Sequence, residues 1–216
     1  MKALVRRWRT RLKYWGLDRK GIFAKIYRDN LWKNAESVSG PGSTREVTTE
    51  MRPILQDIWR RYAIRSVVDA ACGDFNWMRE MDLEGLDYTG LDIVPELVEA
   101  NQQAYATSNI RFRQADLVED RLPAADLILC RDVFVHLPAE AISAALDNFR
   151  RSNARYLLAT TFPTQANHDI HPGQWRPINL SAPPFDLGPP LESHPESADP
   201  NNPLHIKHLA LWELKP

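Results

Sequence analysis

The feature that most constrains the fold is a repeated alternation between residues 64 and 161. Short segments rich in valine, isoleucine and leucine alternate with longer segments whose apolar residues recur at helical spacing. This pattern predicts strands at 64–70, 86–93, 110–114, 125–130 and 155–161, helices at 95–106 and 139–151, and a short helix over 76–81. Strands that alternate with helices pair in parallel, because each helix returns the chain to the same end of the sheet. The sequence therefore predicts an α/β fold with a mainly parallel sheet.

The segment before this core is predicted to be a helical extension over residues 1–62. It contains the stretch ESVSGPGST at 36–44, whose glycine, proline and serine residues favour turns. The hydroxyl groups of this stretch, including those of Ser43 and Thr44, suit a loop that closes over a polar cofactor, and a plain linker is the alternative. A helix capped by Thr48 or Thr49 is expected to follow.

Residues 63–216 are predicted to form the main domain, which would bind the ligand and carry the catalytic residues. Ten of the sixteen prolines lie within 163–203. Because proline lacks a backbone N–H group, this segment is expected to contain neither regular helix nor central strand. Its large apolar residues indicate a cap that packs on the domain. The run at 205–214 is predicted to be a closing strand.

The composition is that of an ordinary globular protein. The chain has 216 residues, of which 44% are hydrophobic, and a chain of this length folds without disulfides or a structural metal. No apolar run approaches the roughly 20 residues of a membrane span, and no signal-like apolar stretch follows the N-terminus. Two cysteines, Cys72 and Cys130, have no metal-ligand spacing and are expected to be packing residues. These features predict a cytoplasmic protein.

The net charge of −1 hides a strong asymmetry. Residues 1–28 contain ten basic residues and one acidic residue, whereas the remainder of the chain is net negative. Apolar residues at helical spacing between the basic ones predict an amphipathic helix: Leu4, Val5, Trp8, Leu12 and Trp15. Such a helix packs on the domain, packs on a second copy in a homodimer, or lies on an anionic membrane surface. The acidic remainder argues against nucleic acid as a partner.

Acidic residues lie at or just after the carboxyl ends of four predicted strands. In chain order they are Asp69, Asp92, Asp116 and Asp132. In wound α/β sheets these strand ends meet where ligands bind. A dinucleotide site needs G-x-G-x-x-G after the first strand, but only Gly73 is present there, and the neighbouring carboxylates of Asp69 and Asp74 would repel a phosphate. The pattern suits a cationic adenosine cofactor without phosphate, S-adenosyl-L-methionine (SAM), with Asp92 on its ribose hydroxyls.

Four motifs in this region resemble those of class I, Rossmann-like SAM-dependent methyltransferases. They are SVVDAACGDFNWM, YTGLDIV, RQADL and DLILCRDVFVHL, and the resemblance covers residues 66–161. CGDFNWM together with CRDVFVHL is typical of a small bacterial subfamily, and SVSGPGST fits it too. The chain departs from the family's usual three glycines, with Ala71 and Phe75 at the first and third positions. The resemblance implies a Rossmann-like fold with an antiparallel C-terminal strand, and SAM as the cofactor.

The resemblance also implies which residues hold SAM. Its methionine and ribose parts are expected beside Asp69, Ala71, Gly73 and Asp74. Its adenosine is expected beside Asp92, Ile93, Asp116 and Leu117, with Asp116 and Leu117 at the amino edge of the adenine. Arg131 is expected beside the sulfonium. Trp77 is expected to pack in the core or in the wall of this site, with a platform for the substrate as the alternative.

Methyl transfer to a hydroxyl needs a base, because charge develops on the oxygen as the methyl group is transferred. His136, six residues after the fourth predicted strand, is the first candidate, and Asp132 on the same loop would orient its ring. A structural histidine near the following helix is the alternative. His168 and Asp169 are the second candidates. Together with Asp132 they could hold Mg²⁺, which would lower the pKa of an acceptor hydroxyl.

These inferences predict a SAM-dependent O-methyltransferase that acts on a hydroxyl group of a small polar acceptor. The whole chain also resembles, more weakly, the sugar O-methyltransferases of methylmannose polysaccharide synthesis, which implies a sugar or oligosaccharide acceptor. A small-molecule or peptide carboxylate O-methyltransferase is the alternative within enzymes, since it would need no strong base. A nicotinamide-dependent oxidoreductase is disfavoured by the missing glycines, and a non-catalytic protein with this fold by the strand-end acids.

Overall fold

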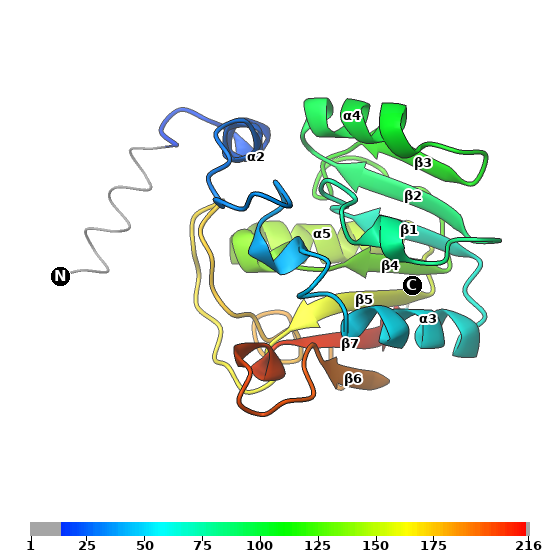
Figure 1. Cartoon of the computed structure of the whole chain (residues 1–216). Helices are drawn as coiled ribbons and strands as arrows, with labels where there is room; N and C mark the ends of the chain where they lie inside the picture. Colours follow the sequence, from blue (N-terminus) through cyan, green and yellow to red (C-terminus); the bar gives the residue numbers. More distant parts are fainter. Residues whose placement is uncertain (1–13, 215–216) are drawn as a thin grey trace.

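The computed structural model describes residues 14–214, which contain a seven-stranded sheet in the order β3-β2-β1-β4-β5-β7-β6 (Figure 1). Five strands are parallel: β1 (Ser66–Ala70), β2 (Asp87–Asp92), β3 (Ile110–Gln114), β4 (Leu127–Cys130) and β5 (Tyr156–Thr161). Strand β7 (His208–Glu213) runs antiparallel to β5, and the edge strand β6 (Glu192–Pro195) runs antiparallel to β7. The predicted parallel sheet with an antiparallel C-terminal strand is confirmed.

Four α-helices accompany the sheet in the described part of the chain: α2 (Arg19–Arg28), α3 (Met51–Arg61), α4 (Pro95–Tyr105) and α5 (Ala139–Arg151). Short 3-10 helices cover Pro41–Ser43, Met78–Glu80, Phe134–His136 and Pro203–Ile206. The helix predicted over 76–81 is therefore only a single 3-10 turn. Helix α3 begins after Glu50, not after Thr48 or Thr49, and the hydroxyl groups of both threonines donate to preceding carbonyl groups.

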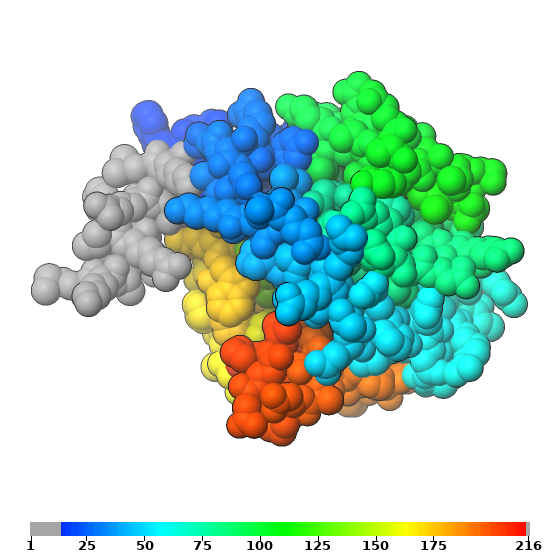
Figure 2. All heavy atoms as spheres, in the orientation of Figure 1, coloured from blue at the N-terminus to red at the C-terminus, as the bar shows by residue number. Residues whose placement is uncertain are grey.

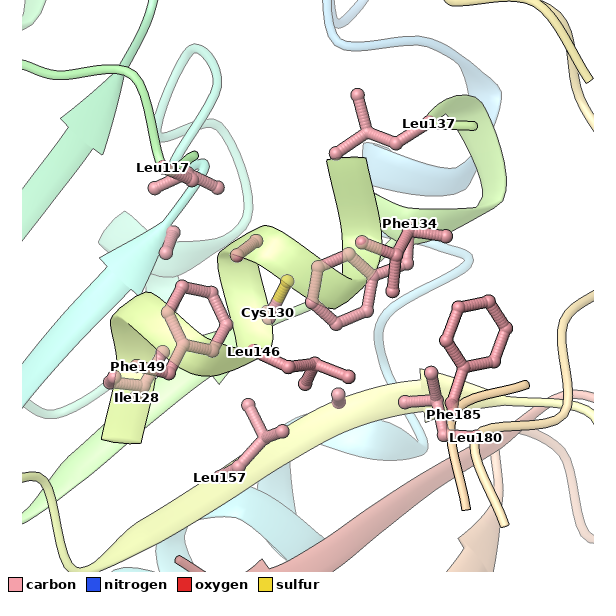
Figure 3. Packing of buried hydrophobic residues seen from close by; sticks show 14 of the residues in the cluster. Leu117, Ile128, Cys130, Phe134, Leu137, Leu146, Phe149, Leu157, Leu180 and Phe185 are labelled. Atoms are coloured by element: carbon pink, nitrogen blue, oxygen red, sulfur yellow. The ribbon is translucent and has the colours of Figure 1, made fainter. Parts of the chain in front are cut away.

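Side chains that alternate along the parallel strands pack into two clusters on opposite faces of the sheet. One cluster contains Ile128 of β4 and Phe149 of α5 (Figure 3). The other contains Leu129 of β4 and Ile58 of α3. The free cysteines belong to these clusters, where burial raises the pKa of both thiols, Cys72 and Cys130. Both faces of the sheet are therefore covered, and its strand ends are left to form a site.

The proline-rich segment packs as a cap, held by the buried side chain of Arg176. Its guanidinium donates to the backbone carbonyl groups of Phe134, Leu137 and His168, which ties the cap to the loop after β4. The segment also contains β6, which the sequence did not predict. Because β6 lies at the edge of the sheet, its unpaired side tolerates the surrounding prolines.

Most of the predicted N-terminal stripe lies outside the described residues: Leu4, Val5, Trp8 and Leu12. The structure describes Trp15, whose exposed fraction is 83%. After it, Ile22 and Ile26 of α2 are buried close to Gly173, where an ideal Cβ atom would lie 3.0 Å from Ile22 Cγ2. No helix within residues 14–214 is long and apolar enough to cross a membrane. The three roles considered for the basic segment stay predictions.

Candidate functional site

A cavity of about 990 Å³ lies at the carboxyl ends of the parallel strands. Its floor contains the four strand-end acids predicted from the sequence, Asp69, Asp92, Asp116 and Asp132. Its walls come from α2, the 38–43 segment and the cap. Figure 2 shows the blue N-terminal residues and the gold cap residues lying against one another on this side of the molecule. Residues on both sides of the boundary predicted at 62/63 therefore line one cavity.

The turn after β1 fixes the position of Asp92. Gly73 has a φ of 57°, which glycine adopts without strain. Its N–H group donates to Asp92 Oδ2 at 3.2 Å, and the N–H group of Val94 donates to Oδ1 at 3.0 Å. Burial raises the pKa of Asp92 to about 6, although these amides lower it. The carboxyl group at the end of β2 is thus held rigidly in the floor of the cavity.

Asp69 at the end of β1 is a second buried carboxyl group. The Tyr88 hydroxyl donates to its Oδ2 at 2.7 Å. Burial raises the pKa of Asp69 to about 7, and the charge of Arg131 opposes this rise. A poorly hydrated carboxylate gains free energy from a cationic or hydroxyl-bearing ligand. Asp69 and Asp92 together therefore fit a ligand that carries positive charge and a ribose diol, as SAM does.

Asp74 does not face the cavity as the resemblance implied. Its Oδ1 accepts hydrogen bonds from the hydroxyls of Ser37 and Ser39, both at 3.0 Å, and its Oδ2 accepts one from the N–H group of Val38 at 2.9 Å. This carboxylate instead fastens the SVSGPGST segment to the turn after β1. Ser43 lies in the cavity wall, whereas the Thr44 hydroxyl donates to the carbonyl group of Pro41.

Asp116 after β3 is paired with a residue that the sequence had not singled out for the site. Arg19 of α2 donates to both of its carboxylate oxygens, with the shortest contact 2.6 Å between Nη2 and Oδ2. Arg19 also contacts Glu119 at 3.2 Å. Helix α2 is therefore fastened over the part of the cavity where the adenine was expected. Other predicted residues lie in the cavity wall as expected: Ala71, Trp77, Ile93 and Leu117.

Arg131 lines the cavity, but its charge is balanced by residues of the C-terminal segment. Its Nε and Nη2 donate to the two carboxylate oxygens of Glu196 at 3.0 and 2.7 Å. Lys207 Nζ lies 2.9 Å from Glu196 Oε2 and 2.5 Å from Asp132 Oδ2, and Arg131 Nη1 lies 3.4 Å from Asp132 Oδ2. These four side chains, called here the charge ring, contain two cations and two anions. Burial lowers the pKa of Arg131, but Glu196 and Asp132 outweigh burial and raise it.

Arg131 also connects the charge ring to the rest of the cavity wall. Its Nη1 donates to the carbonyl group of Gly42 at 2.9 Å, and its guanidinium lies 5.6 Å from the centre of the Trp77 ring. An ideal Cβ at Gly42 would lie 3.0 Å from Asp132 Oδ2, so a glycine lets the loop approach this closely. The charge ring therefore joins the 36–44 segment, the end of β4 and the C-terminal segment.

His136 is half-buried and lies in the cavity wall. Its Nδ1 lies 2.9 Å from the carbonyl oxygen of Gln174, and its ring stacks on that of Trp32 with centroids 5.1 Å apart. Because a carbonyl oxygen only accepts, Nδ1 carries the proton and Nε2 is the basic nitrogen. Burial lowers the pKa of His136, although Gln174 and Asp132 raise it. The ring is oriented by Gln174, and Asp132 instead pairs with Lys207, contrary to the sequence prediction.

The structure does not assemble the predicted magnesium ligands. Asp169 Oδ1 accepts the N–H group of Ala139 at 2.7 Å and so satisfies the first turn of α5. Asp132 is paired with Lys207, which competes with a metal for the same carboxylate. His168 lines the cavity, and its side chain is exposed. Across residues 14–214 no three His, Cys, Asp or Glu side chains are grouped so that they could hold a metal ion.

Several residues of the site have no recognisable signal in the sequence. Arg19 belongs to a run of basic residues that looks like a solvated helix face, and Glu196 lies among prolines and small polar residues without a recognisable motif. Trp32 and Lys207 are isolated aromatic and basic residues in their segments. The sequence could indicate only that such partners exist, because buried cations at the strand ends require acidic partners from elsewhere in the chain. It could not indicate which residues these partners are.

Comparison with known proteins agrees with this geometry. Residues 67–154, less than half of the chain, match the profile of a family described as a methyltransferase domain. No curated protein sequence matches the chain significantly. Among solved structures, magnesium protoporphyrin IX methyltransferase (ChlM) from Synechocystis PCC 6803 with bound SAM has a TM-score of 0.61 at 17% identity, covering 91% of this chain and 97% of that one.

Two further solved structures cover most of this chain. N-methyltransferase NodS from Bradyrhizobium japonicum WM9 with S-adenosyl-L-homocysteine (SAH) has a TM-score of 0.63 at 13% identity, covering 88% of this chain and 99% of that one. Human N-acetylserotonin methyltransferase with SAM has a TM-score of 0.60 at 16% identity, covering 95% and 62%. Membership of the small bacterial subfamily stays a prediction. The chain has the Rossmann-like fold of class I SAM-dependent methyltransferases, and SAM is the cofactor that this fold and the matched domain imply.

Proposed function

We propose that this protein transfers a methyl group from SAM to a hydroxyl oxygen of a small polar acceptor, with a saccharide as the preferred class. Asp92 would hold the ribose hydroxyls, and Asp69 would face the positively charged part of the cofactor. When bound, SAM supplies an electrophilic methyl group on a good leaving group. The protein then has to orient the acceptor, exclude water and take the hydroxyl proton.

The observation that carries this proposal is the state of His136. Its Nδ1 proton is held by Gln174, its ring is fixed against Trp32, and it lines the same cavity as Asp69 and Asp92. Because burial lowers its pKa, the imidazole is neutral at pH 7 and Nε2 can accept a proton. An acceptor hydroxyl is the group that benefits from such a base, whereas a carboxylate needs none.

The charges of the cavity also favour a neutral acceptor over a carboxylate. A carboxylate acceptor would be stabilised by an unpaired cation in the wall. In the described residues the Lys and Arg side chains that line the cavity are Arg19, Arg131 and Lys207, and each is paired with an acidic residue. The remaining wall combines aromatic rings with hydrogen-bonding groups, including Trp32, Trp175 and Gln174. This mixture suits the apolar faces and hydroxyl groups of a sugar.

The experiment combines an acceptor panel with variants of two histidines. Formation of SAH is measured with monosaccharides, oligosaccharides and small carboxylates, and calorimetry with SAM and with NAD separates a methyltransferase from an oxidoreductase. His136→Ala should lower kcat by about 10²–10⁴-fold and leave the affinity for SAH unchanged. His171→Ala is the matched control, because His171 is exposed and lies outside the cavity lining.

The pH profile supplies a second test. In the wild type, kcat/KM should fall as the pH drops through a value below 6.5, and this step should vanish in His136→Ala. Transfer only to carboxylates, or a His136→Ala protein with wild-type turnover, would refute hydroxyl methylation by this base. Binding of SAM without transfer to any member of the panel would favour a non-catalytic protein.

A further inference from the structure

Arg131 places a positive charge in the wall of a cavity whose proposed ligand is also positively charged. Asp69 and Asp92 attract a cationic ligand, whereas an unpaired guanidinium beside them would repel it. This inference rests on the proposed function, because it takes SAM as the ligand. The energetic problem is acute where water is excluded, since a unit charge there changes the affinity for a second charge by about tenfold or more.

Glu196, which is 65 positions after Arg131 in the sequence, supplies the compensating negative charge. Both carboxylate oxygens of Glu196 accept hydrogen bonds from Arg131, in the side-on arrangement that binds guanidinium best. The Glu196 side chain has no exposed surface, and that of Arg131 is 3% exposed. Asp132 cannot neutralise Arg131 alone, because it also pairs with Lys207. Without Glu196 the charge ring would contain two cations and one anion.

We propose that Glu196 is a positioning residue for the cofactor, which neutralises the charge ring so that the cavity accepts a sulfonium. Glu196 belongs to the C-terminal segment, outside the part of the chain that matches the methyltransferase domain. A purely structural ion pair would support SAM and SAH binding equally. A charge-balancing residue discriminates between them, because SAM carries a sulfonium where SAH has a neutral thioether, and the two are otherwise alike in charge.

The test is the ratio of the SAM and SAH dissociation constants, measured by calorimetry on the full chain. Glu196→Gln keeps the size and part of the hydrogen bonding of Glu196 but removes its charge. Its Kd for SAM should rise about tenfold or more relative to its Kd for SAH. Glu192→Gln is the matched control: Glu192 also pairs with an arginine, Arg61, but Arg61 lies outside the cavity lining, whereas Arg131 belongs to it, so the ratio for this variant should equal that of the wild type.

A double variant checks the sign of the effect. Arg131→Met combined with Glu196→Gln removes one cation and one anion, so the SAM-to-SAH ratio should return toward the wild-type value. Equal weakening of SAM and SAH in Glu196→Gln, or an unchanged ratio, would overturn the role of Glu196 and leave the proposed function intact. A wild-type protein that bound neither compound would overturn the proposed function itself.

Discussion

The contact between the 36–44 segment and the turn after β1 can be tested through Gly73. Its φ of 57° lies in the left-handed region, and an ideal Cβ there would lie only 2.2 Å from Ser39 Oγ and 3.0 Å from Ser39 Cβ. Gly73→Ala therefore has to displace Ser39. The displacement breaks two hydrogen bonds, from Ser39 Oγ to Asp74 Oδ1 at 3.0 Å and from the Asp74 N–H group to Ser39 Oγ at 2.9 Å.

The expected cost has two parts. Each lost hydrogen bond costs about 1 kcal/mol, and the left-handed backbone costs an alanine about 1–2 kcal/mol. Gly73→Ala should thus lower the free energy of unfolding by about 3–4 kcal/mol. Gly85→Ala isolates the backbone part, because Gly85 has a φ of 70° and an ideal Cβ there meets no atom within 4 Å. It should lose only about 1–2 kcal/mol.

Urea denaturation of the two variants measures this difference, and calorimetry with SAH reports whether the displaced segment also weakens cofactor binding. Ser39→Ala supplies a coupling test. Since that variant has already lost both hydrogen bonds, adding Gly73→Ala should cost less than it does in the wild type. If Gly73→Ala is no more destabilising than Gly85→Ala, the segment is not held on Gly73 in the way described here.

Three further predictions concern the buried polar residues Asp92 and Arg176. Asp92→Ala should weaken SAH binding by about 1.5–3 kcal/mol, the size of a lost charge-assisted hydrogen bond. The folded-state pKa of Asp92, about 6, is above its unfolded value of about 3.9, so its contribution to stability is present below pH 4 and is lost as the pH rises through 6. Urea denaturation of the ligand-free wild type, repeated at several pH values, should show the free energy of unfolding falling by up to about 3 kcal/mol as the pH rises from 4 through 6. The fall should be smaller in Asp92→Asn, and an equal fall in the two proteins would refute the burial argument. Arg176→Met should cost about 3 kcal/mol or more, because it removes three hydrogen bonds from a buried guanidinium, to the carbonyl groups of Phe134, Leu137 and His168. Arg150→Met, which breaks an exposed pair with Asp147, should cost under about 1 kcal/mol, and equal losses in the two variants would contradict this account.

The parallel strands could be predicted from the sequence because local signals and burial agree there. Leu127–Cys130 is apolar throughout and is buried on both faces, so periodicity and packing give the same answer. The strand-end acids were also predictable, since strand order alone brings Asp69 and Asp92 to one edge of the sheet. Their placement needs no knowledge of side-chain contacts.

The contacts between distant segments could not be predicted in this way. Asp74 and Asp116 look like ligand-binding acids in sequence, yet one fastens the 36–44 segment and the other pairs with Arg19. Asp132 likewise looks free to orient His136 until Lys207, 75 residues later, is brought beside it. Such pairings depend on how distant segments pack in three dimensions. Because these segments have no periodicity of their own, composition and residue spacing cannot predict the pairings.

The cavity is assembled from one part of the chain that matches the methyltransferase domain and from other parts that lie outside that match. Its floor lies within residues 67–154, the part that matches, whereas α2, the 38–43 segment and the cap lie outside that match. Mutations in these flanking parts that keep Arg19 and Lys207 can reshape the cavity wall without removing the partners of the strand-end acids Asp116 and Asp132. Proteins that share this floor can therefore diverge in acceptor while keeping one cofactor. Exchange of cavity-wall residues within 14–43 or 162–207, with Arg19, Glu196 and Lys207 kept, is then expected to alter acceptor choice.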